Sequence, residues 1–235
     1  MTLIGILLLT IINIPIESDG LYHYGIEWVN DYSWPMENLQ YSDDESVRID
    51  NKFYNDGWTK SFYKTNRNCK DSHWEGGSLD QDYVDNAHFS VYIGHGDSDD
   101  LLISTYTEHA DASNCGWGNE NWKKNNWVVL YGCHNAQGPF SEAFAGNHLI
   151  IGFKSSGRVT SNGRLSDRFV DEMIDDDNYI DDSWFAAGDA ELTSSVTQRI
   201  MGETPDMFFD HLYGHGNVKA DPPIDSTYYY RDNQC

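Results

Sequence analysis

The chain has 235 residues, and its 38 Asp and Glu outnumber its 15 Lys and Arg to give a formal net charge of −23 at pH 7. This balance argues against binding to nucleic acid or to anionic membrane surfaces, because both need clustered Lys and Arg. Hydrophobic residues make up 39% of the chain, which is enough for a core. At this length we expect one sizeable α/β domain.

The first residues, MTLIGILLLTIINIPI, form an uncharged apolar stretch that the polar ESDG follows at once. The stretch is shorter than the roughly 20 residues of a membrane span and has the length of a signal-peptide core. It lacks a basic start and an Ala-x-Ala cleavage site, so a buried first strand or a retained anchor stays an alternative. We expect a leader at 1–18, a single domain at 19–235, secretion or display at the cell surface, and no integral membrane span.

The remaining chain alternates predicted strands and helices. Apolar, β-branched and aromatic runs predict strands, and amphipathic stretches with helix-start or helix-stop residues predict helices. The strands are expected at 21–29, 60–66, 87–93, 127–131 and 149–153, and the helices at 42–58, 139–147, 160–174 and 190–201. This alternation predicts βαβ units, and hence a mainly parallel sheet with helices on both faces.

Acidic runs and cysteines bear on cofactors. The runs DSDD (97–100) and DDDNYIDD (175–182) lack the spacing of an EF-hand loop, so they suit a solvated surface, with Ca²⁺ binding as the alternative. No cysteine spacing suggests zinc, and no cofactor is required by the chemistry considered below. In an exported protein Cys69 and Cys115 could pair as a disulfide, whereas Cys133 ends an apolar run and is the candidate free thiol.

Two predicted strands end in residues that can react together. His95 follows the strand that ends at Ile93, and Cys133 follows the strand that ends at Tyr131. The carboxyl ends of parallel strands open onto one edge of a sheet, so we expect an imidazole and a thiol in the same crevice. The thiolate is the effective nucleophile, and a nearby imidazole can hold it in that form or protonate a leaving group. The Gly96 and Cys133 amides are candidate oxyanion donors.

At these residues the sequence resembles a known group. A strand that closes in His-Gly (VYIGHG), a second that closes in Cys (VVLYGCHNA) and a third apolar strand (LIIGF) resemble the caspase-like cysteine peptidase clan, which holds gingipains, clostripain, legumain, separase and CHAT domains. A closer resemblance, in WEGGSLDQDYVDNAHFSVYIGHG and DDSWFAAGDA, is to an uncharacterised, mainly prokaryotic group. The resemblance implies a caspase-like three-layer fold, a His95/Cys133 dyad with the Gly96 and Cys133 amides as oxyanion donors, and a peptide or protein substrate.

Four further residues are candidates for the substrate pocket of this site. Tyr131, two residues before the candidate nucleophile, is expected to line the substrate pocket by the same resemblance, and it supplies no carboxylate. Asp97, Asp99 and Asp100 are candidates for that role, and with the acidic surface they predict a weak preference for Arg or Lys before the cleaved bond.

Two other histidines of the chain also need an interpretation. His134 is an alternative base, and a second Gly-His-Gly at 214–216 is expected to be a loop. The sequence therefore predicts either an exported peptidase that acts through a thioester at Cys133 or a catalytically silent caspase-like domain that binds or supports other molecules.

Overall fold

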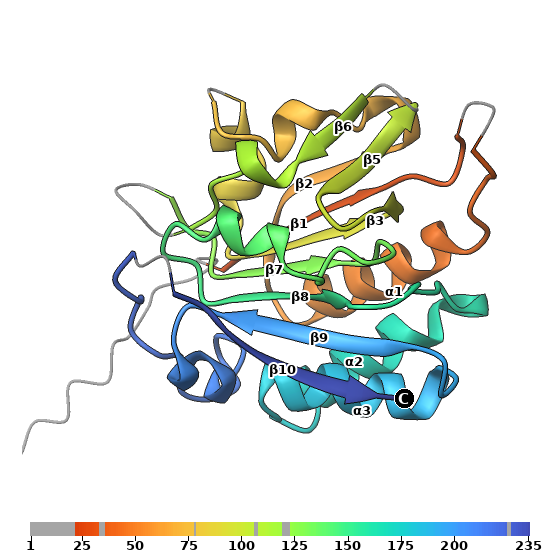
Figure 1. Ribbon diagram of the computed structural model, residues 1–235. Coiled ribbons are helices and arrows are strands. Elements are labelled where there is room, and N and C mark those ends of the chain that lie inside the picture. Colours follow the sequence, from red (N-terminus) through yellow and green to blue (C-terminus); the bar gives the residue numbers. More distant parts are fainter. Residues whose placement is uncertain (1–21, 33–35, 78, 106–107, 119–122, 225–226) are drawn as a thin grey trace, which may run out of the picture.

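The computed structural model describes residues 22–235 except 33–35, 78, 106–107, 119–122 and 225–226 (Figure 1). The predicted leader at 1–18 lies outside the described residues. Within them, a seven-stranded sheet has the order β10-β9-β8-β7-β3-β1-β2, and a three-stranded sheet has the order β4-β5-β6.

The strands of the large sheet are mostly parallel. They are β1 (His23–Trp28), β2 (Thr59–Thr65), β3 (Phe89–Ile93), β7 (Trp127–Leu130), β8 (Leu149–Phe153), β9 (Thr197–Gly202) and β10 (Tyr229–Gln234). The first five are mutually parallel, whereas β9 runs antiparallel to β8, and β10 antiparallel to β9. Every residue of β3, β7 and β8 is buried, as expected for central strands covered on both faces. The predicted α/β class with a mainly parallel sheet is confirmed.

The strand order creates a switch point between β1 and β3. The chain moves outward from β1 to β2 through α1 (Ser42–Asn55), then returns past β1 to β3 and continues to β7 and β8. Parallel crossovers are right-handed, so a reversal of direction in the sheet moves the connection to the opposite face. In open α/β sheets, ligands bind outside the carboxyl ends of the strands at such a point.

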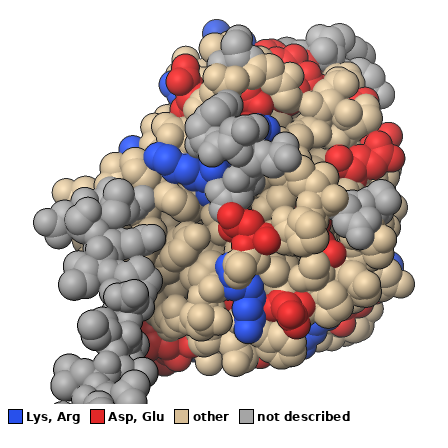
Figure 2. Space-filling model, turned by 90° about the vertical axis from the view of Figure 1, so that its left-hand side faces the viewer, with Lys and Arg blue, Asp and Glu red and all other residues tan. Residues whose placement is uncertain are grey.

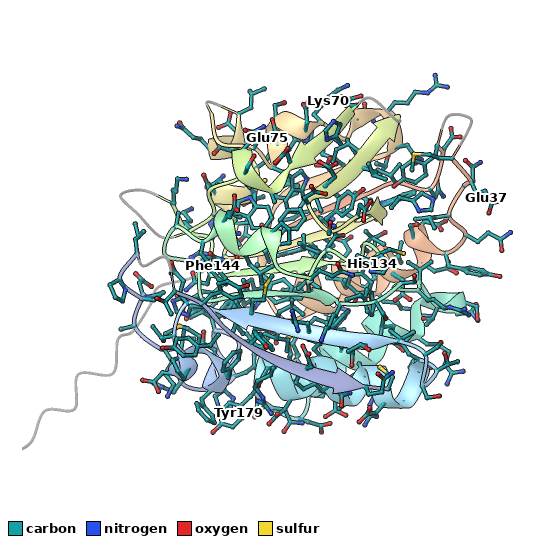
Figure 3. The ribbon with its side chains drawn as sticks, viewed as in Figure 1. Glu37, Lys70, Glu75, His134, Phe144 and Tyr179 are labelled. Atoms are coloured by element: carbon teal, nitrogen blue, oxygen red, sulfur yellow. The ribbon has the colours of Figure 1, made fainter. Side chains whose placement is uncertain are left out.

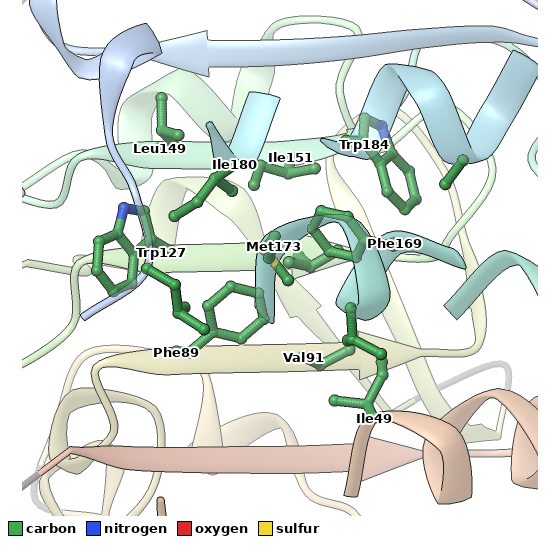
Figure 4. Packing of buried hydrophobic residues seen from close by; sticks show 14 of the residues in the cluster. Ile49, Phe89, Val91, Trp127, Leu149, Ile151, Phe169, Met173, Ile180 and Trp184 are labelled. Carbon is green, nitrogen blue, oxygen red and sulfur yellow. The ribbon is translucent and has the colours of Figure 1, made fainter. Parts of the chain in front are cut away.

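One face of the sheet is covered by three helices. They are α1, α2 (Arg164–Ile174) and α3 (Ile180–Glu191), and each turns an apolar stripe toward the strands (Figures 1 and 4). Ile49 of α1, Phe169 of α2 and Trp184 of α3 are fully buried there. Burial of each such side chain contributes roughly 1.5–3 kcal/mol. Trp184 also donates a 3.3 Å hydrogen bond from its indole to the Gly152 carbonyl of β8, which aligns α3 with the sheet.

The other face is covered differently from the prediction. Short 3-10 segments and the small sheet, β4 (His95–Gly96), β5 (Asp100–Thr105) and β6 (Glu108–Asp111), pack there in a second core. The 3-10 segments are η1 (Asn66–Asn68), η2 (Asp71–His73), η3 (Asp80–Asp82), η4 (Val84–Asn86), η5 (Ala112–Asn114) and η6 (Pro139–Ala143). In the described part of the chain no α-helix lies on this face, so the expectation of helices on both faces is wrong. Compact aromatic packing, as between Trp74 and Trp117, takes their place.

Two helix predictions need correction. The helix predicted at 190–201 is wrong, because α3 ends at Glu191 and β9 begins at Thr197. Between them the Thr193 and Ser195 hydroxyls bond each other at 2.8 Å, and such local bonding by Ser and Thr competes with helix. The helix predicted at 139–147 shortens to the 3-10 turn η6. Cys69 and Cys115, which could pair in an exported protein, are both buried free thiols in the structure.

The surface shows where part of the charge lies. Figure 2 shows the face at the amino ends of the parallel strands. On this face both acidic and basic residues are present, and uncharged residues cover wide areas between them. Much of the acidic run 175–182 is paired with cations: Asp175 with Lys52, and Asp181 and Asp182 with Arg231. Among the described residues, no helix is long and apolar enough to cross a membrane.

Two histidines anchor the segment that follows β9 and the 3-10 turn η8 (Pro205–Phe209). His148 is fully buried at the amino end of β8, with Nδ1 2.5 Å from Asp210 and Nε2 3.2 Å from Asp221. His215, from the second Gly-His-Gly, bridges Asp177 and Asp56 at 2.8 Å each, and the predicted loop there is confirmed. Burial alone would lower the pKa of both rings, but the carboxylates outweigh it and raise the pKa above the usual value.

These clamps predict loss of stability in mild alkali. A histidine whose pKa is raised by folding contributes stability that is complete below its unfolded pKa of about 6.5 and is lost as the pH rises through the folded pKa. We expect the melting temperature to fall from about pH 6 to about pH 9, and His148→Gln to remove much of that dependence at a cost of about 3–5 kcal/mol. Thermal unfolding across this range measures both.

His88 provides the control for that experiment. Burial lowers the pKa of His88 to about 4, so its ring is neutral throughout the tested range. His88→Gln is therefore expected to leave the alkaline slope unchanged. An equal slope in wild type and His148→Gln would show that the clamp at His148 does not carry a charge.

Candidate active site

His95 is held at the carboxyl edge of the sheet by main-chain and aromatic contacts. It begins β4, two residues after β3 ends, and its main-chain N–H donates to the Tyr32 hydroxyl at 2.7 Å. Its ring packs 4.6 Å from the ring of Tyr32 and places Nε2 2.8 Å from the Glu37 carbonyl. Figure 3 shows Glu37 on the side toward which the parallel strands point.

The Glu37 contact determines which ring nitrogen of His95 can accept a proton. A carbonyl oxygen only accepts hydrogen bonds, so Nε2 of His95 must donate to it. In the neutral ring Nδ1 then carries the free lone pair. This contact thus sets the neutral tautomer of the ring, with the hydrogen on Nε2 and the lone pair on Nδ1.

Cys133 shares a cavity with His95. The ladder from β3 to β7 continues to Tyr131, whose N–H donates to the Tyr92 carbonyl at 2.8 Å, and Cys133 follows two residues later. The Cys133 Sγ lies 3.7 Å from the Gly157 carbonyl. A cavity of about 220 Å³ is lined by Leu39, Gly94, His95, Tyr131, Cys133, Gly157, Arg158 and Val159. The structure therefore places both residues on the wall of one cavity, and direct contact between the imidazole and the thiol stays a prediction.

Close contact between two backbone segments makes this juxtaposition possible. A Cβ atom at Gly132 would lie 3.2 Å from the Gly96 Cα and 1.7 Å from the Asn135 Oδ1. A Cβ atom at Gly96 would lie 2.3 Å from the same oxygen. The buried Asn135 side chain therefore packs against both glycines, and its Nδ2 donates to the carbonyls of Asp97 and Asp100 at 2.7 and 2.9 Å. Only glycine fits at either position.

The two predicted oxyanion donors have free or outward-facing amides. Asp97 N–H donates to the Asp100 carbonyl at 3.0 Å, so Gly96, one residue earlier, occupies a non-hydrogen-bonded position opposite Leu101, with its N–H turned away from β5. Within the described residues no backbone carbonyl accepts the Cys133 amide hydrogen. Both amides are thus left for another acceptor, and their role as an oxyanion hole stays a prediction.

The predicted pocket residues divide into two groups. Tyr131 lines the cavity, while its hydroxyl accepts a 2.9 Å bond from Ser166 and burial raises its pKa well above the usual value, so it is neutral. Asp97, Asp99 and Asp100 do not line the cavity. Asp97 and Asp99 are exposed, and the Asp100 carboxylate bonds His109 at 2.7 Å. These three residues therefore supply no carboxylate to the cavity wall.

His134, the alternative base, is engaged elsewhere. Its N–H donates to the Ser155 carbonyl at 2.9 Å, and its Nδ1 lies 2.7 Å from the Gln137 side-chain amide. It is not among the residues that line the cavity. Its role is to join the segment after Cys133 to the segment after β8 (Figure 3).

Several residues of the site were not predicted. Tyr32 and the Glu37 carbonyl position His95, Asn135 packs against the two glycines, and Arg158 adds a charge to the cavity wall. Asn135 could have been proposed from the sequence, because it lies two residues after Cys133. Tyr32 and Glu37 carry no such signal, because their roles depend on contacts across β1 and β3.

The described part of the chain was also compared with the requirements of a metal site. No group of three or more His, Cys, Asp or Glu side chains is arranged there to hold a metal ion. Binding of Ca²⁺ at the acidic runs stays a prediction.

The comparison with protein families places the chain in one of them. Residues 26–233 match the family described as Domain of unknown function (DUF6345), and the match covers most of the chain. The chain therefore belongs to this family. A search of curated proteins found no match.

The close contact at the glycines predicts the effect of a single methyl group. The new methyl group in Gly132→Ala should push away both the Asn135 side chain and the Gly96 backbone, because both lie too close to it. Overpacking of this kind destabilises a protein by about 1–3 kcal/mol. We expect a lower melting temperature and slower alkylation of Cys133. Gly116→Ala is the control, since no atom lies within 4 Å of a Cβ there. Unchanged Cys133 reactivity in Gly132→Ala would contradict the role given to this contact.

Proposed function

We propose that this protein is an exported cysteine hydrolase of the caspase-like kind, which cleaves peptide bonds through a thioester at Cys133. The observation that carries the proposal is that His95 and Cys133, from the ends of neighbouring parallel strands, line one cavity at the switch point of the sheet. The strand-end motifs that resemble the caspase-like clan support the same assignment.

The catalytic groups of the proposed reaction all belong to this chain, and His95 first accepts the proton of the Cys133 thiol. The Cys133 sulfur, as thiolate, attacks the substrate carbonyl carbon, and the carbonyl oxygen becomes an oxyanion near the Gly96 and Cys133 amides. His95 donates a proton to the departing amine as the C–N bond breaks and a thioester remains. Water then attacks the thioester, His95 accepts its proton, and the C–S bond breaks to release a carboxylic acid and regenerate Cys133.

A second hollow supports an extended substrate. It has a volume of about 600 Å³ and shares Leu39 with the first cavity. Most of the residues that line it are of polar types: the lining is Asn30, Asp31, Asn38, Leu39, Gln40, Tyr41 and Asp43. Two adjoining hollows suit successive residues of a peptide better than one small molecule.

One contact favours the alternative of a silent binding domain. The Cys133 thiol donates to the Gly157 carbonyl, 3.7 Å from the Sγ, so its hydrogen is engaged with the main chain. A silent domain would keep this contact permanently. An enzyme would exchange it for contact with His95 when substrate enters.

Thiol reactivity separates the two functions. We expect iodoacetamide to alkylate Cys133 quickly at neutral pH and His95→Asn to slow this by about 10²-fold or more, since acid–base assistance contributes 10²–10⁴-fold. Cys235 in the same chain is the reference thiol, because burial and the nearby Asp189 raise its pKa to about 11. Peptide mapping by mass spectrometry gives both rates. Alkylation of Cys133 no faster than of Cys235 would support the silent domain.

Export is tested at the N-terminus. Secreted protein from the native host should lack residues 1–18, because a signal peptide is removed during translocation. Intact-mass measurement decides this. Secreted material that retains Met1 would contradict cleavage.

A further inference from the structure

Glu45 carries a buried carboxylate that the proposed reaction does not use. It lies in the first turn of α1 and is fully buried. Among the described residues no Lys, Arg or His forms an ion pair with it. Other buried carboxylates of the chain have such a partner, as Asp85 has Lys123 at 2.9 Å. A carboxylate buried without a cation is tolerated only where several donors satisfy its oxygens.

The donors to Glu45 come from the segment that joins β8 to α2. The Thr160 N–H and hydroxyl donate to Oε1 at 2.6 and 2.5 Å, and the Ser166 N–H donates to Oε2 at 2.7 Å. The Thr160 hydroxyl also accepts the Leu165 N–H at 2.9 Å. Gly163, which precedes α2, provides no side-chain cap. A carboxylate from α1 thus satisfies the first turn of α2, where the helix dipole favours a negative charge.

The start of this segment forms part of the cavity wall. Gly157 and Val159 line the cavity, and Thr160 follows directly. The Gly157 carbonyl accepts the thiol hydrogen of Cys133, so the chain passes beside the reacting sulfur. Its path there is held, one residue beyond the lining, by the two hydrogen bonds from Thr160 to Glu45.

A second part of the cavity wall is connected to the same carboxylate. Tyr131, directly after β7, lines the cavity, and its hydroxyl accepts a 2.9 Å hydrogen bond from the Ser166 hydroxyl. The N–H of the same serine donates to Glu45. Glu45 itself is not among the residues that line the cavity. One buried carboxylate is thus connected to both the wall segment after β7 and the wall segment after β8.

We propose that Glu45 is a positioning residue of the candidate active site, whose carboxylate holds the two wall segments in place and so sets the shape of the cavity in which Cys133 reacts. This inference rests on the proposed function. A glutamine cannot substitute for Glu45, because its Nε2 is a donor and would face the N–H of Ser166 or the donors of Thr160. Hydrogen bonds to a charged acceptor are also roughly twice as strong as those between neutral groups.

Two alkylating agents with the same reactive carbon test this. Iodoacetamide is small, whereas iodoacetanilide carries a phenyl ring that must fit against the wall formed by Leu39, Tyr131 and Val159. The measured quantity is the ratio of Cys133 alkylation rates, iodoacetanilide over iodoacetamide, divided by the same ratio at Cys235. We expect it to fall about 10-fold in Glu45→Gln, which corresponds to loss of one charge-assisted contact. Peptide mapping by mass spectrometry gives the rate at each cysteine.

Glu172→Gln is the matched control. Glu172 is also a buried glutamate of this helical layer, and its carboxylate accepts a 2.7 Å hydrogen bond from Asn178 and pairs with Arg168. None of these three residues lines the cavity. Glu172→Gln is therefore expected to leave the rate ratio unchanged. An equal fall in Glu172→Gln and Glu45→Gln would assign the effect to the loss of any buried carboxylate and overturn the inference.

Ser166→Ala tests one connection alone. It removes the hydroxyl that contacts Tyr131 and keeps the N–H that donates to Glu45, so it serves if Glu45→Gln unfolds. Unfolding would be evident from alkylation of Cys69, which is fully buried in the folded protein. We expect the rate ratio to fall about 3-fold in Ser166→Ala, since one neutral hydrogen bond is lost. An unchanged ratio in Ser166→Ala, or in Glu45→Gln with Cys69 unlabelled, would overturn the inference.

The same measurement separates this inference from the proposed function. Wild-type Cys133 that reacts with iodoacetamide no faster than Cys235 contradicts the proposed thiol chemistry. The rate ratio can still be measured in that case, and it reports on the shape of the cavity. Fast alkylation of Cys133 with the same ratio in wild type and folded Glu45→Gln would leave the thiol chemistry in place and contradict the role of Glu45 alone.

Discussion

The candidate site depends on the contact between two strand ends. Gly96, after β3, and Gly132, after β7, approach so closely that neither can carry a side chain, and Asn135 fills the space beside both. Parallel pairing sets the strands at their usual spacing, but the loops beyond them would normally diverge. Here the glycines and the amide hold them together. The positions of His95, of Cys133 and of both free amides follow from this one contact.

The histidines of the chain show how surroundings assign different roles to one residue type. His148 and His215 each lie between two carboxylates, which raise the pKa of both rings, and they attach the segment after β9 to the rest of the fold. His88 is half-buried and has no acid beside it, and the partial burial lowers its pKa to about 4. His95 has a carbonyl on one nitrogen and a cavity on the other side. Of these four, only His95 combines a fixed tautomer with access to a nucleophile.

Local sequence patterns predicted most of the framework and the two reacting residues. Apolar runs identified β3, β7 and β8 because fully buried strands are continuous in sequence, and the carboxyl-end rule then placed His95 and Cys133 together. The helix prediction at 190–201 was wrong. Part of this stretch forms β9, which is stabilised by pairing with β8 on one side and with β10 on the other. Propensity is weak against such tertiary contacts.

The parts of the site that sequence reasoning missed depend on residues far apart in the chain. Tyr32, which follows β1, contacts the main chain of His95, and Arg158, which follows β8, lines the same cavity as Cys133. The candidate carboxylates were chosen because they follow His95 in sequence, yet the β4–β5 hairpin turns them away from the cavity. Nearness along the chain does not determine which residue faces a ligand when a hairpin intervenes.

The partner of the His95 ring is a main-chain oxygen, and this affects how the family can vary. The Glu37 carbonyl accepts the Nε2 hydrogen whatever side chain residue 37 carries. Related chains can therefore differ at this position and still orient the imidazole, provided the path of the loop is kept. Alignments and alanine scans, which both examine side chains, would pass over the group that fixes the ring; a change in loop length would reveal it.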